Sequence, residues 1–288
     1  MRRTISTTII SSLALIAAAG AANAAAHAKK AVGDDVIAAQ RAKLAETTAG
    51  AGFGPQSPRD IDRLAGANER VFEAAPAYAE MNLCNIHFHE NAEHRGGDFT
   101  LYAGNGDGKG AGTGFRYNGT LSTAELAPLG AKIGEGKYGD LAPGDTIEVH
   151  YVHTTAQVMP GPTLGACLSD SIMNPQLRVE AQVMVLVNDE NALDFRELAA
   201  LGVVNGKQQA LNIPTDMGAP VRYAGSTTGP GYNEKGSPLQ VTWSVRPKVA
   251  KVDINSLATW LKDNPFDEDH AHGVRNLVQN PALLSPIE

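Results

Sequence analysis

Short apolar runs alternate with turn residues over most of this chain, and this pattern predicts a sheet built from short strands. Valine, isoleucine, tyrosine and phenylalanine recur in these runs, and glycine, proline, asparagine and aspartate separate them. The expected strands are 82–90, 145–155, 176–189, 219–225 and 239–253.

Only two segments predict helices. Residues 34–48 hold few breakers and begin with Asp34 or Asp35 as the N-cap, and 256–264 reads as a short helix near the end. The Gly/Pro-rich stretch 49–58 predicts a linker. We therefore expect a mainly β, α+β chain, in which 25–60 form a helix with its linker and 61–288 form one domain.

Residues 1–24 have the features of a bacterial secretory signal peptide. A basic start is followed by an apolar run and small residues, and cleavage is expected after Ala24, with Ala26 and Ala28 as alternatives. The apolar run is shorter than the ~18 residues that span a membrane, and no later stretch is apolar enough. The expected location is the periplasm or the exterior.

The charge balance narrows the class of partner. Loss of Arg2 and Arg3 with the signal peptide leaves 22 of the 24 basic residues against 31 acidic ones, a net charge of −9. Nucleic-acid binding needs a basic face, so we exclude that class. A hydrophobic content of 43% supports one sizeable core and fits a small-molecule function.

The two cysteines, Cys84 and Cys167, favour a disulfide, because an oxidising compartment pairs isolated thiols. Such a bond would join the strand 82–90 to the loop 161–170. The alternative is that Cys84, three residues before His87, is a soft metal ligand.

The segment "NIHFHENAEH" carries the most informative chemistry. Residues two apart in a strand share a face, so His87 and His89 project together and can bind one ion. In "TIEVHYVHTT", Glu148, His150 and Val152 share one face, whereas His153 falls on the other and is expected to be a core group. Three imidazoles leave Zn²⁺ an open position, where a bound water reaches a pKa near ~7.

The runs "HFHE…EH" and "EVHYVHTT", followed by "YAGSTTGPGYNEKGSPLQVTWSV", resemble the metal strands and the Thr-Thr block of α-class carbonic anhydrases. Over most of residues 70–288 the chain is most similar to the δ-class and δ-like carbonic anhydrases. The resemblance implies an α-carbonic-anhydrase-like twisted, antiparallel-rich sheet with short peripheral helices. It also implies hydration of CO₂ to bicarbonate by zinc-bound hydroxide, and Co²⁺ or Cd²⁺ fits the same ligands.

The resemblance implies roles for individual residues. His87, His89 and His150 hold zinc, and Glu148 accepts a hydrogen bond from the third histidine. The threonine that orients the hydroxide corresponds to Thr227.

In the same resemblance Glu93 orients Thr227, and Thr228 lies near bicarbonate. Two matches stay open: a leucine that the α class has beside its threonines is missing here, so the register leaves Thr227 or Thr228, and Glu90 is an alternative to Glu93. The walls of the apolar pocket are Val152 and Trp243.

Proton transfer to solvent needs a group that titrates near pH 7. His94 is a candidate by proximity in sequence. His270 and His272 are candidates by chemistry, although a solvated acidic loop is the favoured reading of "DEDHAHG".

Two other classes compete with a carbonic anhydrase. His87, His89 and Glu93 fit the His-x-His-x₃-Glu metal motif of cupins, and Pro143-Gly144 resembles a cupin turn. In a cupin, however, Thr227 and Trp243 need not approach the metal. The third class is a non-catalytic periplasmic protein that binds metal or bicarbonate.

Overall fold

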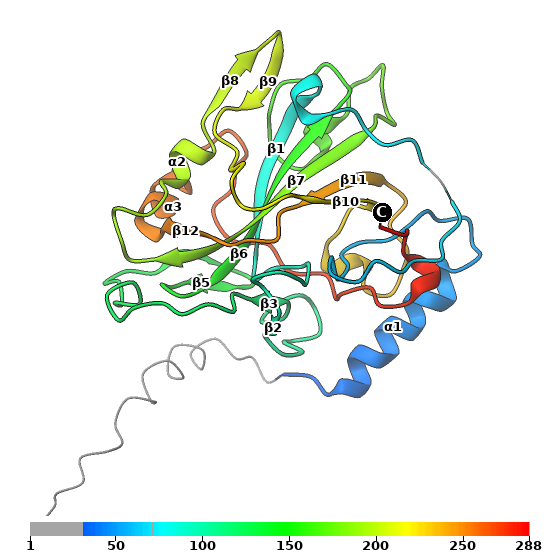
Figure 1. Cartoon of the computed structure of the whole chain (residues 1–288), viewed down its shortest axis with the longest axis horizontal. Coiled ribbons are helices and arrows are strands. Elements are labelled where there is room, and N and C mark those ends of the chain that lie inside the picture. The colour runs from blue at the N-terminus through cyan, green and yellow to red at the C-terminus, as the bar shows by residue number, and fades with distance from the viewer. Residues whose placement is uncertain (1–30, 71, 288) are drawn as a thin grey trace, which may run out of the picture.

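The computed structural model describes residues 31–70 and 72–287, so the expected signal peptide lies outside the described residues. A twisted six-stranded sheet runs through the centre of the molecule (Figure 1). Five of its strands follow one another in the order β1 (Asn82–Glu90), β6 (Thr146–Thr154), β7 (Leu177–Val187), β11 (Gln240–Val245) and β10 (Val221–Ser226).

The sheet is mixed around its central strand. The pairs β1–β6, β6–β7 and β10–β11 are antiparallel, whereas β11 and β12 (Ala250–Asp253) both run parallel to β7. The single run expected over 239–253 is therefore two strands, which pair in succession with the same edge of β7. Pro247 lies in the break between them, and a proline has no N–H for a ladder.

The alternation of side chains divides the core into two layers. One face of the sheet carries Phe88, Val149 and Met184 and packs with the short helices α2 (Phe195–Leu198) and α3 (Ile254–Trp260). The opposite face carries Val152, Val179 and Trp243 among others. The expected mainly β class is confirmed, and α3 is the helix predicted at 256–264.

The remaining elements are peripheral. The helix α1 spans Asp34–Thr48, as predicted, but its N-cap is Gly33, so both aspartates lie in the first turn, where they favour the helix dipole. Small antiparallel pairs and 3₁₀ turns complete the chain: β2 (Leu101–Tyr102) with β3 (Phe115–Arg116), β4 (Ile133–Gly136) with β5 (Gly139–Leu141), β8 (Leu201–Val204) with β9 (Lys207–Ala210), and turns at Tyr78–Glu80, Leu164–Cys167, Pro230–Tyr232 and Pro281–Leu283.

The last residues of the Gly/Pro-rich stretch 49–58 are buried in the body of the protein. Gln56 and Ser57 have no exposed surface. The amide of Gln56 donates to the carbonyls of Gly54 and Ser237, and the Ser57 hydroxyl accepts from the backbone N–H of Ser226. Composition alone predicts a linker here. The long-range partners that bury the segment cannot be read from the local sequence. Across the described residues, no helix has both the length and the apolar character of a membrane span.

Candidate metal centre

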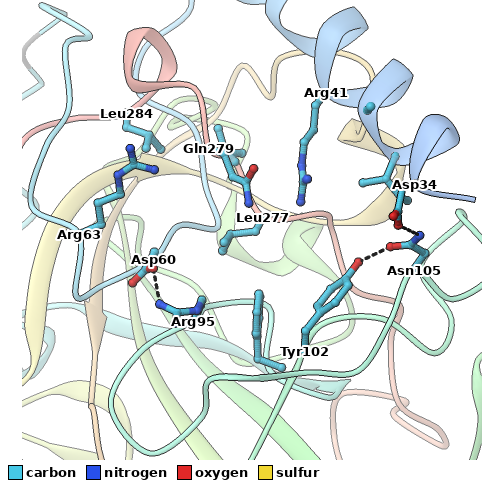
Figure 2. A pocket seen from close by; sticks show the side chains of 14 residues that line it. Asp34, Arg41, Asp60, Arg63, Arg95, Tyr102, Asn105, Leu277, Gln279 and Leu284 are labelled. Atoms are coloured by element: carbon cyan, nitrogen blue, oxygen red, sulfur yellow. Dashed lines mark hydrogen bonds and ion pairs between the residues drawn. The ribbon is translucent and has the colours of Figure 1, made fainter.

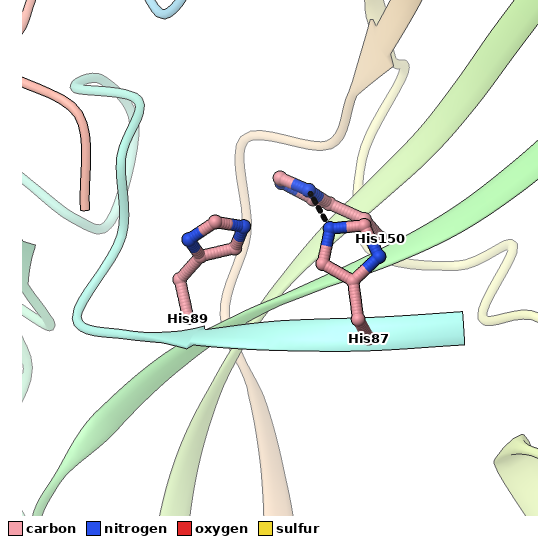
Figure 3. A group of neighbouring side chains, drawn as sticks. All are labelled: His87, His89 and His150. Carbon is pink, nitrogen blue, oxygen red and sulfur yellow. Dashed lines mark hydrogen bonds between the residues drawn. The ribbon is translucent and has the colours of Figure 1, made fainter. Parts of the chain in front are cut away.

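Three imidazoles converge on one face of the sheet, where β1 lies beside β6 (Figure 3). The strand register places His87 opposite His150 and His89 opposite Glu148. One nitrogen from each of the three histidines lies within 4.8 Å of the others. The sequence-predicted ligand set is therefore a spatial cluster.

Hydrogen bonds fix which ring nitrogen of each histidine faces the cluster. Nδ1 of His87 lies 2.6 Å from the side-chain oxygen of Asn85, and Nδ1 of His89 lies 3.0 Å from the carbonyl oxygen of Gly273. Both oxygens are acceptors, so each Nδ1 carries the proton and each Nε2 keeps a lone pair. His150 is turned the other way, because its Nε2 donates to Glu148 at 3.1 Å and leaves Nδ1 unprotonated.

One separation between these nitrogens matches the spacing of two ligands on a tetrahedral cation. His150 Nδ1 lies 3.3 Å from His87 Nε2, and two nitrogens at ~2.1 Å from one zinc ion lie roughly 3.4 Å apart. The buried Nε2 of His89 has no hydrogen-bond partner among the described residues. Lone pairs facing one another in a buried site are unfavourable unless a cation fills the space between them.

A buried carboxylate accepts a hydrogen bond from one of the three imidazoles. Glu148 is fully buried and accepts four hydrogen bonds. Its Oε1 accepts from His150 Nε2 and from His94 Nδ1 at 2.5 Å, and its Oε2 accepts from the backbone N–H groups of Glu93 and His94 at 2.7 and 3.1 Å. The chain of contacts continues from His94 Nε2 to the Tyr223 hydroxyl at 2.6 Å.

Burial and neighbouring charges set the protonation of these groups. Burial, with the neighbouring histidines, lowers the pKa of His87 well below its ordinary value and lowers that of His89 to about 4. Burial alone would raise the pKa of Glu148, but His94 and His150 beside it hold that pKa well below its usual range. Neutral imidazoles backed by a carboxylate are the protonation states that a metal site requires.

A pocket of about 260 Å³ opens onto the three imidazoles. Its wall is apolar on one side, formed by Val152 and Trp243, which were predicted, and by Leu177, Val179 and Val241, which were not. Such a wall suits a nonpolar substrate. The expected Thr227 and Thr228 also line the pocket.

The other expected site residues make contacts that the sequence does not reveal. The hydroxyl of Thr227 bonds to that of Ser237 at 2.6 Å. Oε1 of Glu93 accepts from the backbone N–H of Arg275 at 2.9 Å, and its buried Oε2 has no hydrogen-bond partner among the described residues. Burial raises the pKa of the neighbouring Glu90 to about 7, with Asp145 adding to the effect.

The contacts of His94 do not fit a proton shuttle. Both of its ring nitrogens are hydrogen-bonded and its side chain has no exposed surface, so it supports Glu148 instead. His272 lies at the pocket with its side chain 44% exposed, and its ring centre is 5.5 Å from that of His87. A hydrogen bond to Glu268 raises the pKa of His272 against the effect of burial. The segment read as a solvated loop instead pairs with β1, since the N–H of His272 donates to the carbonyl of Phe88.

The predicted disulfide between Cys84 and Cys167 is present, with 5.0 Å between the two Cα atoms. Cys84 is therefore not a metal ligand. The bond ties β1 to the segment that brings Thr163 and Leu164 to the pocket rim. The histidine strand is thus covalently linked to one wall of the site.

The cupin ligand set does not match this arrangement. The Glu93 carboxylate lies 3.4 Å from Nδ1 of His89, the nitrogen that points away from the cluster. Trp243 packs against His150 with ring centres 5.0 Å apart, and it shares the pocket with Thr227. This proximity is the feature that a cupin would not need.

Sequence reasoning missed the groups that orient the imidazoles. Asn85 lies two residues before His87, so strand periodicity could have identified it. The carbonyl of Gly273 and the hydroxyls of Tyr223 and Ser57 come from distant segments, and Tyr223 donates to Ser57 at 3.0 Å. No local signal could have revealed these three.

Comparison with known proteins points to one family. The family model described as "Delta carbonic anhydrase" matches residues 78–256. No curated protein sequence matches the chain.

Several solved structures are similar at low sequence identity. One is a hyperthermostable carbonic anhydrase from a hydrothermal vent chimney, at 16% identity and a TM-score of 0.28, with 80% of this chain and 87% of that chain covered. Another is the α-carbonic anhydrase of Thermovibrio ammonificans with sulfanilamide, at 14% identity, a TM-score of 0.26 and coverage of 77% and 84%. Dioscorin with ascorbate has 16% identity, a TM-score of 0.29 and coverage of 81% and 84%. These overall similarities are too low to carry the assignment, which rests on the family match.

Proposed function

The chain belongs to the delta carbonic anhydrase family and is a carbonate dehydratase, and from this premise we propose that it uses Zn²⁺ held by His87, His89 and His150. The observation that carries the proposal is the set of unprotonated nitrogens, with 3.3 Å between those of His150 and His87. Co²⁺ or Cd²⁺ would fit the same imidazole ligands. The substrates are CO₂ and bicarbonate.

When bound, zinc acidifies a coordinated water to a pKa of ~7 and so supplies a nucleophile at neutral pH. The protein keeps the imidazoles in the correct tautomers. Glu148 does this for His150, and Asn85 and the Gly273 carbonyl do it for the other two histidines.

The pocket prepares the substrate. The apolar wall around Val152 and Trp243 accepts CO₂ and excludes competing water. Thr227 orients the nucleophile through its hydroxyl, and Thr228 lies where bicarbonate forms. The free Oε2 of buried Glu93 is the acceptor that we assign to the threonine hydroxyl.

His272 is the residue that we place in proton transfer to solvent. It lies at the pocket, half-exposed, beside the ring of His87. Its Nε2 is hydrogen-bonded to Glu268 at 2.8 Å. Export to an oxidising compartment is part of the same proposal, and the Cys84–Cys167 disulfide supports it.

Stopped-flow CO₂ hydration tests this function. We expect zinc-replete protein to hydrate CO₂ with saturation kinetics. The variant His150→Ala should lose both this activity and zinc binding. The matched control is His153→Ala, because His153 is equally buried on β6 but faces away from the cluster. Zinc-replete protein without hydration would contradict the enzyme and favour a non-catalytic binder. Activity that survives His150→Ala would overturn the ligand set.

A further inference from the structure

A second cavity, of about 380 Å³, lies between α1 and the body of the protein (Figure 2). Its size falls within the range of small-molecule sites. The apolar part of its lining comes from Ile37 and Ala38 on α1 and from Phe115, Leu277, Val278 and Leu284. None of its lining residues belongs to the pocket over the three imidazoles.

Three arginines line this cavity in a chain whose net charge is negative. Figure 2 shows Arg41 extending from α1 into the cavity, with Arg63 on the opposite side. Arg95 forms an ion pair with Asp60 at 2.5 Å. Within residues 31–70 and 72–287 no ion pair is formed by Arg41 or Arg63.

The acidic groups of the cavity are already engaged. Asp60 is used by Arg95, and Asp34 accepts a hydrogen bond from the side chain of Asn105 at 2.7 Å. The oxygen of the same Asn105 amide accepts from the Tyr102 hydroxyl at 2.8 Å. Neither carboxylate forms an ion pair with Arg41 in the part of the chain that the structure describes.

One N–H donor of the Arg41 guanidinium lacks an acceptor within the described residues. Its Nε is buried and has no partner among the described residues. Burial also lowers the pKa of Arg41, as expected for a charge that is partly removed from water. A buried donor without a partner is costly, and a planar guanidinium matches a carboxylate with two parallel hydrogen bonds.

We propose that this cavity binds a small organic carboxylate. Arg41 holds the carboxylate head, Arg63 contributes positive charge from the opposite side, and the hydrocarbon body packs on Ile37, Phe115 and Leu277. Bicarbonate and sulfate have no such body, so the apolar wall selects against them. This site is independent of the metal centre.

Isothermal titration calorimetry with hexanoate tests the proposal on the mature protein. We expect saturable binding that weakens at least tenfold in Arg41→Gln. Arg41→Lys keeps the charge without the planar fork, and we expect it to weaken binding as well. The control is Arg222→Gln on the edge strand β10, an exposed arginine outside the cavity, which should bind as the wild type does.

The outcomes separate this site from the metal centre. Hexanoate binding that Arg41→Gln leaves unchanged would place the ligand elsewhere, the zinc ion included, and would overturn the proposal. Absence of saturable binding would also overturn it, and so would sulfate binding as tightly as hexanoate. Retention of binding in His150→Ala, which removes a metal ligand, would support it even if CO₂ hydration proved absent.

Discussion

Replacement of Glu148 by glutamine should damage both metal affinity and folding, although the two side chains have the same shape. Oε1 of Glu148 faces two imidazole N–H donors and Oε2 faces two backbone N–H donors. Whichever way a glutamine amide is turned, its NH₂ group meets two donors. No rotamer can therefore satisfy the site with the imidazoles in their present tautomers, and a change of tautomer at His150 would protonate the Nδ1 that faces the cluster.

The expected magnitude follows from these four contacts. Glu148→Gln loses two hydrogen bonds to a charged acceptor, each worth about 1.5–3 kcal/mol, so the free energy of unfolding should fall by about 3–6 kcal/mol. His150 also loses the group that fixes its tautomer. Loss of such a partner costs about 10- to 100-fold in metal affinity.

Two assays measure these effects: urea unfolding, and zinc affinity by competition with a chromogenic chelator. The matched control is Glu180→Gln, since Glu180 is also buried, on the adjacent strand β7, but pairs with Arg178 away from the imidazoles. The control should lose stability and keep its zinc affinity. A Glu148→Gln protein with wild-type zinc affinity and stability would refute the four-donor account.

Three further changes have predicted outcomes. Tyr223→Phe should cost about 2 kcal/mol in urea unfolding, because it leaves Nε2 of buried His94 without a partner; an unchanged midpoint would contradict this. Burial lowers the pKa of His153 to about 3, so only the unfolded chain gains its proton between pH 6.5 and 3, and stability should fall by about 2 kcal/mol from pH 7 to 5. In His153→Gln that part of the fall should vanish. Cys84→Ser together with Cys167→Ser removes the bond that closes a loop with a sequence separation of 83, and calorimetry should show a loss of about 4.5 kcal/mol in stability; an unchanged melting temperature would speak against this.

The sequence predicts the parts of this protein that depend on local periodicity. The alternation in 82–90 and 145–155 defines β1 and β6 almost to the residue. It places His87 with His89 on one face of β1, and His150 with Glu148 on one face of β6. It also places His153 on the other face, where it is buried. The pairing of β1 with β6 then brings His87, His89 and His150 together, and that pairing is a long-range contact.

Long-range contacts account for what periodicity could not predict. His94 lies four residues after β1 in sequence, yet its ring turns into the core to meet Glu148 and Tyr223. His272 is distant in sequence, yet its backbone pairs with β1 and brings its ring to the pocket. Proximity along the chain therefore does not indicate which histidine side chain reaches the pocket.

The proposed function makes three imidazoles the ligands of a zinc-dependent catalyst of CO₂ hydration. Its most direct test is the exchange of an oxygen-isotope label between bicarbonate and water, followed by membrane-inlet mass spectrometry at chemical equilibrium. Protein loaded with one zinc ion should accelerate the exchange, and protein stripped of metal should not until zinc is restored. Exchange at the uncatalysed rate from fully zinc-loaded protein would contradict the claim.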